Sequence, residues 1–207
     1  MKYNPDIHHR GSIRLKGYDY SQAGLYFITI CTQNRKCIFG KIIDNGKGTM
    51  ICFLNEYGRI AEREWIKTSE MRHSVHLDVF VIMPNHIHGI IQINKIDDCR
   101  GTMRRARMPM MRCTRMPMHP TIRKGTIHRA PTAEQFGKPT SNTIPTIIRG
   151  YKSSVTKQIN ILRNKPGVPV WQRNYYEHII RDEKSYYKIS EYIKTNPLKW
   201  PDDKYYA

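Results

Sequence analysis

Short apolar runs along the chain predict four strands. The segment GLYFITIC, residues 24–31, combines aromatic and β-branched residues and ends at a polar TQNRK turn. Such a run between turn residues is typical of a strand, and the RKCIFGKII run that follows predicts an extension of this strand as a hairpin. VHLDVFVIM and HIHGIIQI predict two further strands joined tightly through Pro84 and Asn85. The run VWQRNYYEHIIR near the end has the character of a fourth strand.

Three other segments show the spacing of helices. In NEYGRIAEREWIKTSE, apolar residues recur at i, i+4 and i+8. In SNTIPTIIRGYKSSVTKQINIL, Pro145 suits a first helical turn after a cap at Asn142 or Thr143. DEKSYYKISEYIKTN begins with acids, which suit a helix N-terminus. The order predicts an α+β chain whose first six elements follow the βαββαβ pattern of a ferredoxin-like antiparallel sheet, with a helix added at the C-terminus.

The length of 207 residues fits a single domain, 1–207, which a basic low-complexity insert interrupts at about 94–140. Residues 99–131 contain nine Lys and Arg, no acid and four prolines, and RMPM occurs at 107 and again at 115. A segment with this charge and no apolar periodicity is predicted to be flexible. Its composition leaves two readings open: the insert holds nucleic acid electrostatically, or it has no function.

The charge points to a polyanionic partner. Lys and Arg number 35 against 17 Asp and Glu, which gives a formal charge of +18 and a pI near 9.9. Nucleic acid is favoured over a membrane surface, because no basic helix shows a broad apolar face. No apolar run is long enough to cross a bilayer, and the N-terminus lacks a secretory signal, so we expect a cytoplasmic protein with no membrane partner. The five cysteines form no CxxC pair and are predicted to be free thiols.

The run MPNHIHG, residues 83–89, places two histidines inside a predicted buried strand. Alternate side chains of a strand share one face, so His86 and His88 point one way and Ile87, Gly89 and Ile91 point to the opposite, core face. Two neutral imidazoles side by side can converge on one divalent metal. By itself the pair is also consistent with a chance HxH in a chain that has nine histidines.

Three segments together carry a resemblance to a known family. MPNHIHGII resembles the HUH motif of the IS200-like tyrosine transposases, whose small ferredoxin-like domain nicks single-stranded DNA. RLKGYDYSQAGLYFITICTQNRKCIFG resembles the first strand region of the REP-associated tyrosine transposases, and WQRNYYEHIIRDEKSYYKISEYIKTNPLKW resembles their C-terminal signature. The matches span nearly the whole chain except the basic insert.

The resemblance assigns roles to individual residues. It implies that His86 and His88 are metal ligands and that Tyr192, within YIKTNP, is the nucleophile on the C-terminal helix. Asn196 follows one helical turn later and is expected as a third ligand through its carbonyl oxygen. Other tyrosines compete with Tyr192 for the role of nucleophile, and the nearest in sequence are Tyr175, Tyr176, Tyr186 and Tyr187.

The implied activity is metal-dependent nicking and strand transfer of single-stranded DNA at hairpins or palindromic repeats, through a covalent phosphotyrosine. The cofactor is expected to be Mg²⁺ or Mn²⁺ and the partner a DNA strand with hairpin structure; the sequence leaves open whether the protein is a monomer or a homodimer. Trp171, Arg173 and Tyr175 are expected to clamp unpaired bases. The basic residues expected to contact nucleic acid are Arg14, Lys16, Arg149, Lys152 and Arg173.

Two other functions remain open at this point. The first is a DNA-hairpin-binding protein that keeps the fold without catalysis; intact His86, His88 and Tyr192 argue against it, because a pure binder has no need for all three. The second is an RNA-binding module that stacks bases on an open sheet. This function predicts aromatic residues at the positions of the third strand where histidines stand.

Overall fold

The computed structural model describes residues 18–46, 48–94 and 142–206. Within these residues, four antiparallel strands form a sheet in the order β4-β5-β1-β6, and β2 and β3 form a separate ribbon. The strands are β1 (Gly24–Cys31), β2 (Gly40–Asp44), β3 (Met50–Leu54), β4 (Val75–Ile82), β5 (His86–Ile93) and β6 (Tyr176–Ile180). The helices are α1 (Glu56–Glu70), α2 (Ile144–Leu162) and α3 (Glu183–Thr195), with short 3₁₀ turns at Gln33–Arg35 and Trp200–Asp202.

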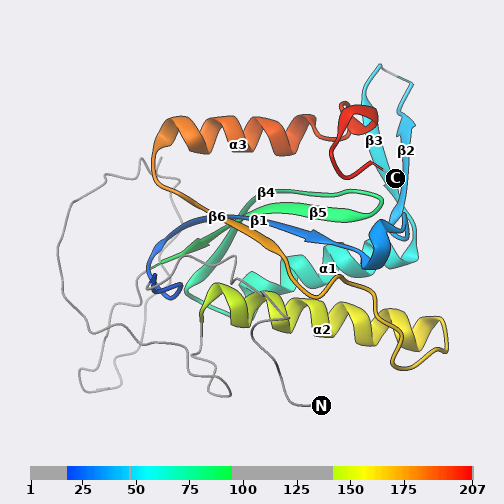
Figure 1. The fold of residues 1–207 in the computed structure, drawn as a ribbon, viewed down its shortest axis with the longest axis horizontal. Coiled ribbons are helices and arrows are strands. Elements are labelled where there is room, and N and C mark those ends of the chain that lie inside the picture. The colour runs from blue at the N-terminus through cyan, green and yellow to red at the C-terminus, as the bar shows by residue number, and fades with distance from the viewer. Residues whose placement is uncertain (1–17, 47, 95–141, 207) are drawn as a thin grey trace, which may run out of the picture.

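The chain order β1-α1-β4-β5-α2-β6 confirms the predicted ferredoxin-like βαββαβ sheet, with the β2–β3 ribbon inserted between β1 and α1. Helices α1 and α2 cover one face of the sheet and α3 lies over the other (Figure 1). The basic insert lies outside the described residues apart from its first residue, Asn94. Among the described helices, none combines the length and apolar content that crossing a membrane requires.

Two strand predictions need correction. The RKCIFGKII run does not extend β1, because β5 and β6 occupy both edges of β1. A turn at Gln33–Arg35, with Asn34 in the left-handed region at φ 55°, leads the chain out of the sheet, and β2 pairs instead with β3, which the sequence did not predict. The last strand is shorter than VWQRNYYEHIIR: Trp171 forms an isolated bridge with Thr32, and regular pairing covers only Tyr176–Ile180.

The helix starts follow from local side-chain caps. Asn55 accepts a hydrogen bond from the Gly58 N–H at 3.0 Å at the start of α1. The predicted cap at the start of α2 is Thr143, whose hydroxyl accepts from the Thr146 N–H at 3.4 Å. These caps satisfy N–H groups that have no partner within the first helical turn. Asp182 does the same for α3, and these local signals explain why the sequence located all three helices.

Strand alternation divides the core into two parts. Tyr26, Ile28 and Ile87 belong to a large cluster between the sheet and helices α1 and α2, whereas Phe27 and Ile90 belong to a small cluster under α3. Gly89 has its own role in the large cluster: a Cβ there would lie 2.6 Å from Cζ2 of Trp65. The absence of a side chain therefore lets the indole of α1 pack against β5 beside the histidine pair.

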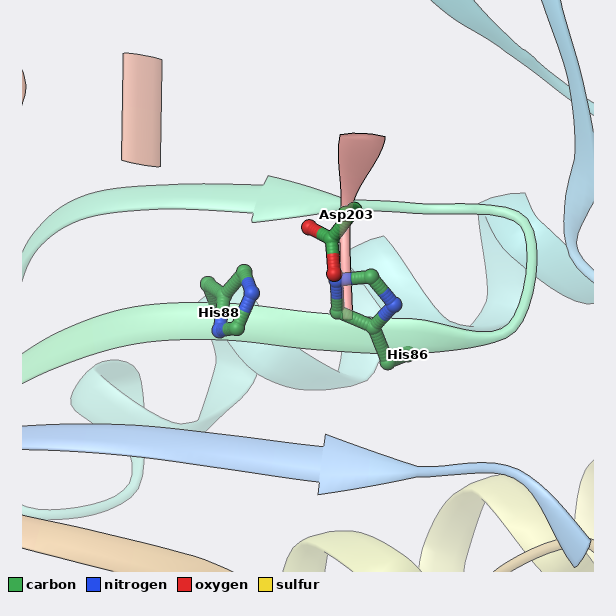
Figure 2. Close-up of side chains that lie close together, drawn as sticks. All are labelled: His86, His88 and Asp203. Atoms are coloured by element: carbon green, nitrogen blue, oxygen red, sulfur yellow. The ribbon is translucent and has the colours of Figure 1, made fainter. Parts of the chain in front are cut away.

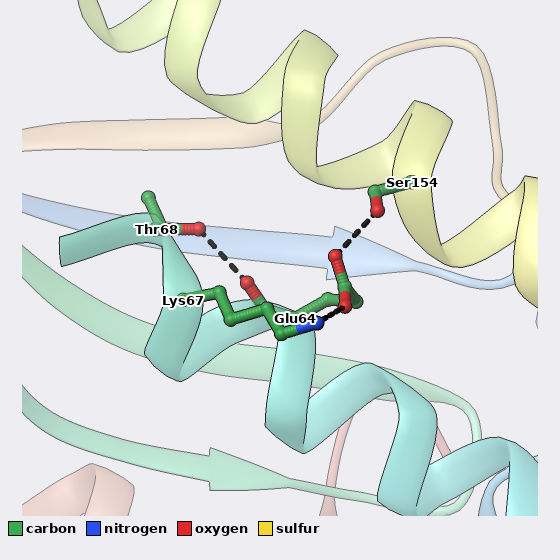
Figure 3. Close-up of polar contacts among 4 residues, drawn as sticks. All are labelled: Glu64, Lys67, Thr68 and Ser154. Atoms are coloured by element: carbon green, nitrogen blue, oxygen red, sulfur yellow. Dashed lines mark hydrogen bonds and ion pairs between the residues drawn. The ribbon is translucent and has the colours of Figure 1, made fainter. Parts of the chain in front are cut away.

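A buried carboxylate joins the two helices of the large cluster (Figure 3). Glu64 on α1 is 4% exposed and accepts hydrogen bonds from the Lys67 ammonium at 2.9 Å and from the Ser154 hydroxyl of α2. Burial alone would raise the pKa of Glu64, but the hydrogen bonds from Ser154, Lys67 and Gln158 outweigh it and the pKa is lowered. The carboxylate is therefore charged and satisfied at neutral pH.

Candidate active site

The histidine pair lies at the start of β5, on the sheet face that α3 covers. His86 and His88 are 0% and 1% exposed, and their cross-strand partners on β1 are Cys31 and Thr29. The imidazole centroids lie 4.5 Å apart. The alternation predicted from the sequence therefore holds: the histidines face α3, and Ile87 lies in the large cluster on the other side.

Each imidazole is oriented through Nδ1. The Nδ1 of His86 lies 2.8 Å from the side-chain oxygen of Asn85, and the Nδ1 of His88 lies 2.8 Å from the Thr29 hydroxyl. An amide oxygen only accepts, so the Nδ1 of His86 donates and its Nε2 carries the lone pair. Among the described residues, the Nε2 of His86 has no hydrogen-bond partner. A histidine held through one nitrogen with the other nitrogen open is typical of a metal ligand.

Both imidazoles are neutral at pH 7. Burial is the largest cause and lowers the pKa of His86 to about 4, although Asp203 and Asn196 act in the opposite direction. Burial also lowers the pKa of His88 well below its ordinary value, with smaller contributions from His86 and from the positive charge of Lys204. The neutral imidazole is the form that binds metals.

Tyr192 on α3 meets this pair. Its hydroxyl lies 3.2 Å from the Nε2 of His88, and its ring packs edge-on against the imidazole at 5.1 Å between centroids. Burial raises the pKa of Tyr192, and the nearby Asp203 and Tyr205 raise it further. The phenol is therefore protonated at neutral pH, and any nucleophilic role requires a positive charge nearby to offset this environment.

Two oxygen donors lie beside the histidines. Asn196, the cap residue at the end of α3, is 2% exposed; its amide nitrogen donates to Asp203 at 2.6 Å, and its carbonyl oxygen has no hydrogen-bond partner among the described residues. Asp203 stands with His86 and His88 in a group whose potential ligand atoms all lie within 4.8 Å of one another. Figure 2 shows the carboxylate directed toward the two imidazoles.

Asp203 is a site residue that the sequence patterns did not predict. It lies seven residues after Asn196 in an irregular segment, PDDKYY, where no periodicity indicates a face. The only local signal is a pair of acids in a strongly basic chain, and it does not distinguish Asp202 from Asp203. Geometry separates them, because Asp202 is exposed and Asp203 is half-buried beside the histidines.

The C-terminal segment, residues 197–206, is held across the site. Its backbone accepts hydrogen bonds from the Arg35 guanidinium at Lys204, 3.2 Å, and from the Asn85 side chain at Tyr205, 2.7 Å. The Tyr205 ring lies 4.7 Å from the imidazole of His86 between centroids. Asn85 thus orients His86 with its oxygen and holds this segment with its nitrogen.

The donor set fits a divalent metal ion. The potential ligand atoms of His86 and His88 on β5 and of Asp203 in the C-terminal segment lie within 4.8 Å of one another, and the Asn196 side chain at the end of α3 donates to Asp203. Carboxylate and amide oxygens suit hard cations such as Mg²⁺, and imidazole nitrogens shift the preference toward transition metals such as Mn²⁺. The open Nε2 of His86 and the open carbonyl oxygen of Asn196 are the atoms that a bound cation would satisfy.

The rival tyrosines make other contacts. The hydroxyl of Tyr186 donates to Asp78 of β4 at 2.7 Å, and Tyr187 is 61% exposed on the outer side of α3. Tyr175 packs against the large cluster on the opposite face of the sheet. Tyr176 lies on the site face of β6, with its ring 6.2 Å from that of Phe27. Of these tyrosines, Tyr192 is the one whose hydroxyl lies at a histidine of the pair.

The residues expected to contact nucleic acid are dispersed. Arg14 and Lys16 lie outside the described residues. Arg149 is exposed on α2, the helix layer on the face of the sheet away from the histidines. Arg173 is exposed in the loop before β6.

Lys152 and Trp171 contact other parts of the protein and are not available to bind nucleic acid in this structure. The ammonium of Lys152 donates to the carbonyl of Gln172 at 2.5 Å and to that of Arg173 at 3.1 Å. Burial lowers the pKa of Lys152 to about 8. Trp171 is 6% exposed in the large cluster, so it has no free face for a base. The loop before β6 is thus fixed from inside, and a stacking surface must be sought elsewhere.

Comparison with known proteins places the chain. No family model matches it. A Haemophilus influenzae protein described as uncharacterised is 43% identical over 207 residues, which are 100% of this chain and 98% of that protein. A second protein of the same organism, described as a putative REP-associated tyrosine transposase, is 24% identical over 181 residues, 87% of this chain and 74% of that protein. The chain is thus similar over most of its length to a protein described as a putative REP-associated tyrosine transposase.

Two solved structures are also similar to this chain. One, a REP-associated tyrosine transposase bound to a REP hairpin, has a TM-score of 0.48 at 18% identity and covers 88% of this chain and 71% of its own. The other, a putative transposase from Deinococcus radiodurans, has a TM-score of 0.42 at 12% identity and covers 88% of this chain and 95% of its own.

Proposed function

We propose that this protein is a transposase that nicks single-stranded DNA at hairpin structures and rejoins it through a covalent link to Tyr192. The observation that carries the proposal is the 3.2 Å approach of the Tyr192 hydroxyl to His88 within a buried, neutral histidine pair. His86 and His88, together with Asp203 and Asn196, would hold the divalent metal. When bound, the metal would neutralise charge on the scissile phosphate and offset the environment that raises the pKa of Tyr192.

The chemistry is a transesterification. The phenolic oxygen of Tyr192 attacks phosphorus, a new P–O bond forms, and the bond from phosphorus to the 3′ oxygen of the preceding nucleotide breaks. The phenolic proton is transferred, directly or through water, to the departing 3′ oxygen. The products are a 5′ phosphotyrosine and a free 3′ hydroxyl, so attack by another 3′ hydroxyl reverses the step and joins strands without an external energy source.

The protein positions the reacting groups before DNA arrives. Thr29 and Asn85 fix the two imidazoles. Tyr186 of α3 donates a hydrogen bond to Asp78 of β4, and this bond fixes the helix that carries Tyr192. Fixing these groups in advance reduces the entropy lost on reaching the transition state. A DNA-hairpin partner is supported by the similarity to a protein described as a putative REP-associated tyrosine transposase and by the +18 charge of this chain, which favours a polyanion.

The test is capture of the covalent intermediate. Purified protein is incubated with end-labelled single-stranded DNA carrying hairpins from its genomic flank, with Mn²⁺, Mg²⁺ or EDTA, and analysed on a denaturing gel. We expect an adduct that requires metal, disappears in Tyr192→Phe and persists in Tyr187→Phe, the matched control on the outer side of α3. An adduct that survives Tyr192→Phe would overturn the assignment of Tyr192 as the nucleophile. Hairpin binding without any adduct would instead support the non-catalytic binding protein.

A further inference from the structure

The site face of the sheet continues past the histidines onto β6, its edge strand. Tyr176 pairs with Thr29 and His178 pairs with Phe27 of β1, so these β6 side chains share the face on which α3 lies. The small cluster under α3 includes Ile180 at the far end of β6. Tyr176, by contrast, is 48% exposed and His178 is exposed. This part of β6 is thus an uncovered strip beside the active site.

A chain of ring contacts joins the strip to the proposed nucleophile. Tyr176 lies 6.2 Å from Phe27 at an interplanar angle of 70°, and Phe27 lies 6.3 Å from Tyr192 at 84°. Phe27 also stacks on His88 at 5.4 Å. Tyr176 is therefore one ring removed from both the tyrosine and the histidine, and its exposed surface adjoins the place where a phosphate would be attacked.

An ammonium group lies over the same ring. The Nζ of Lys204 is 5.6 Å from the centroid of Tyr176 and 4.8 Å from that of Tyr205. Lys204 is exposed, and the Tyr205 ring beneath its ammonium lies 4.7 Å from the imidazole of His86 between centroids, so Lys204 stands at the edge of the histidine pair. No carboxylate forms an ion pair with it among the described residues. Lys204 thus offers its charge to an anion at the edge of the site.

We propose that Tyr176 and Lys204 form a nucleotide shelf that binds the unpaired DNA next to the scissile phosphate, with one base stacked on Tyr176 and a phosphate paired with Lys204. An exposed aromatic ring with a cation beside it is the combination that binds single strands without reading their sequence. The shelf replaces Trp171 and Tyr175, which lie in the core of the opposite face. The shelf proposal rests on the proposed function in one respect: the strand bound on the shelf is taken to be the strand that Tyr192 cuts.

Binding is measured without chemistry to separate the two proposals. The protein carries Tyr192→Phe, the buffer contains EDTA, and the probe is a DNA hairpin with an unpaired flank labelled for fluorescence anisotropy. We expect Tyr176→Ala to weaken binding roughly 5- to 100-fold, the range for loss of one stacked base. Tyr176→Trp restores stacking and should bind within about twofold of the parent, whereas Tyr187→Ala, an exposed tyrosine away from the shelf, should have no effect.

A second readout locates the base. The adenine analogue 2-aminopurine is placed in turn at each unpaired position of the same hairpin DNA, because its fluorescence is quenched on stacking. We expect one position to be quenched on binding and the quenching to be lost in Tyr176→Ala but kept in Tyr176→Trp. Binding by Tyr176→Ala equal to the parent, or quenching that survives the substitution, would overturn the stacking role even if Tyr192 proves to be the nucleophile.

The phosphate contact has its own test. Replacing Lys204 with Gln should reduce the slope of log affinity against log salt by about 0.7, the value for one phosphate contact on a single strand. Lys188→Gln removes an equal charge from the outer side of α3 and should leave the slope unchanged. An unchanged slope for Lys204→Gln would remove Lys204 from the shelf. Because no cleavage is measured, failure of the nicking proposal does not affect this result.

Discussion

The two faces of the sheet differ in how their buried titratable side chains are satisfied. On the face covered by α1 and α2, the buried carboxylate of Glu64 accepts hydrogen bonds from Lys67 and Ser154 and joins the helices. On the face covered by α3, the buried Nε2 of His86 and the carbonyl oxygen of Asn196 have no partner among the described residues. An unsatisfied buried polar atom costs free energy, so these two atoms are candidates for contact with a bound ligand.

The difference shows how one strand serves two purposes. Successive residues of β5 alternate between His86 and His88 toward α3 and Ile87, Gly89 and Ile91 toward the large cluster. Substitutions on one side should therefore affect metal binding and cleavage, and substitutions on the other should affect stability. Variants of each face can show whether the two separate in this way.

The largest effect is expected from the histidines. His86→Ala and His88→Ala should each reduce metal-dependent adduct formation by roughly 10³-fold or more, because removing a member of a catalytic unit abolishes most of its contribution. Loss of a ligand should also abolish saturable Mn²⁺ binding, measured by isothermal titration calorimetry.

His76→Ala provides the control, since this histidine is exposed near the start of β4. Its activity and metal binding should match those of the unaltered protein. If adduct formation persisted in either His86→Ala or His88→Ala, the imidazoles would be packing groups and the contrast between the faces would fail.

Gly89→Ala should act on the opposite face. Its new methyl group would lie 2.6 Å from the Trp65 indole, so the protein should lose roughly 1–3 kcal/mol in free energy of unfolding in urea. Gly150→Ala is the matched control in α2. There the nearest atom is the flexible end of Arg72 at 3.3 Å, and the helix should gain up to about 1 kcal/mol from the better helix former.

Metal affinity measured on the folded fraction of Gly89→Ala should stay unchanged. A loss of metal binding as large as in the histidine variants would mean that the faces are coupled through β5 and are not separable.

The contrast also explains what the sequence could predict. The caps at Asn55 and Thr143 and the alternation around His86 and His88 are local, so the helices and the position of the histidine pair on the face opposite Ile87 were predicted correctly. The resemblance to transposases pointed to Tyr192 on the last helix, and the structure brings its hydroxyl to His88 across more than a hundred residues of chain.

The remaining features depend on tertiary pairing. Asp203 lies beside the histidines in a segment whose backbone is bound by Arg35 and Asn85, which are more than a hundred residues earlier in the chain. Likewise, the register of β6 on β1 directs Tyr176 to the site face. The sequence instead indicated Trp171 and Tyr175 for base stacking, and the structure buries Trp171 in the core, where it forms an isolated bridge with Thr32.

A smaller effect should come from Asp203→Asn. The amide keeps the size of the side chain but removes the anionic ligand, so Mn²⁺ affinity should fall by about 10-fold or somewhat more while the histidines still bind. Isothermal titration calorimetry measures the change. Asp202→Asn removes the same charge from the exposed neighbouring position and should leave the affinity unchanged; equal effects from both variants would indicate general electrostatics and no ligand role for Asp203.

The smallest effect tests the satisfied carboxylate, Glu64. Its folded-state pKa lies below the ordinary value of 4.5, so the charged form stabilises the fold above that value and this contribution is lost as the pH falls through the lowered pKa. Glu64→Gln should therefore cost about 1 kcal/mol in unfolding free energy at pH 7 and progressively less below pH 4.5. Urea denaturation across this range, with Glu62→Gln on the same helix as control, measures the difference. A penalty that stayed constant with pH would show that Glu64 stabilises by packing, and its charge would then not distinguish the two faces.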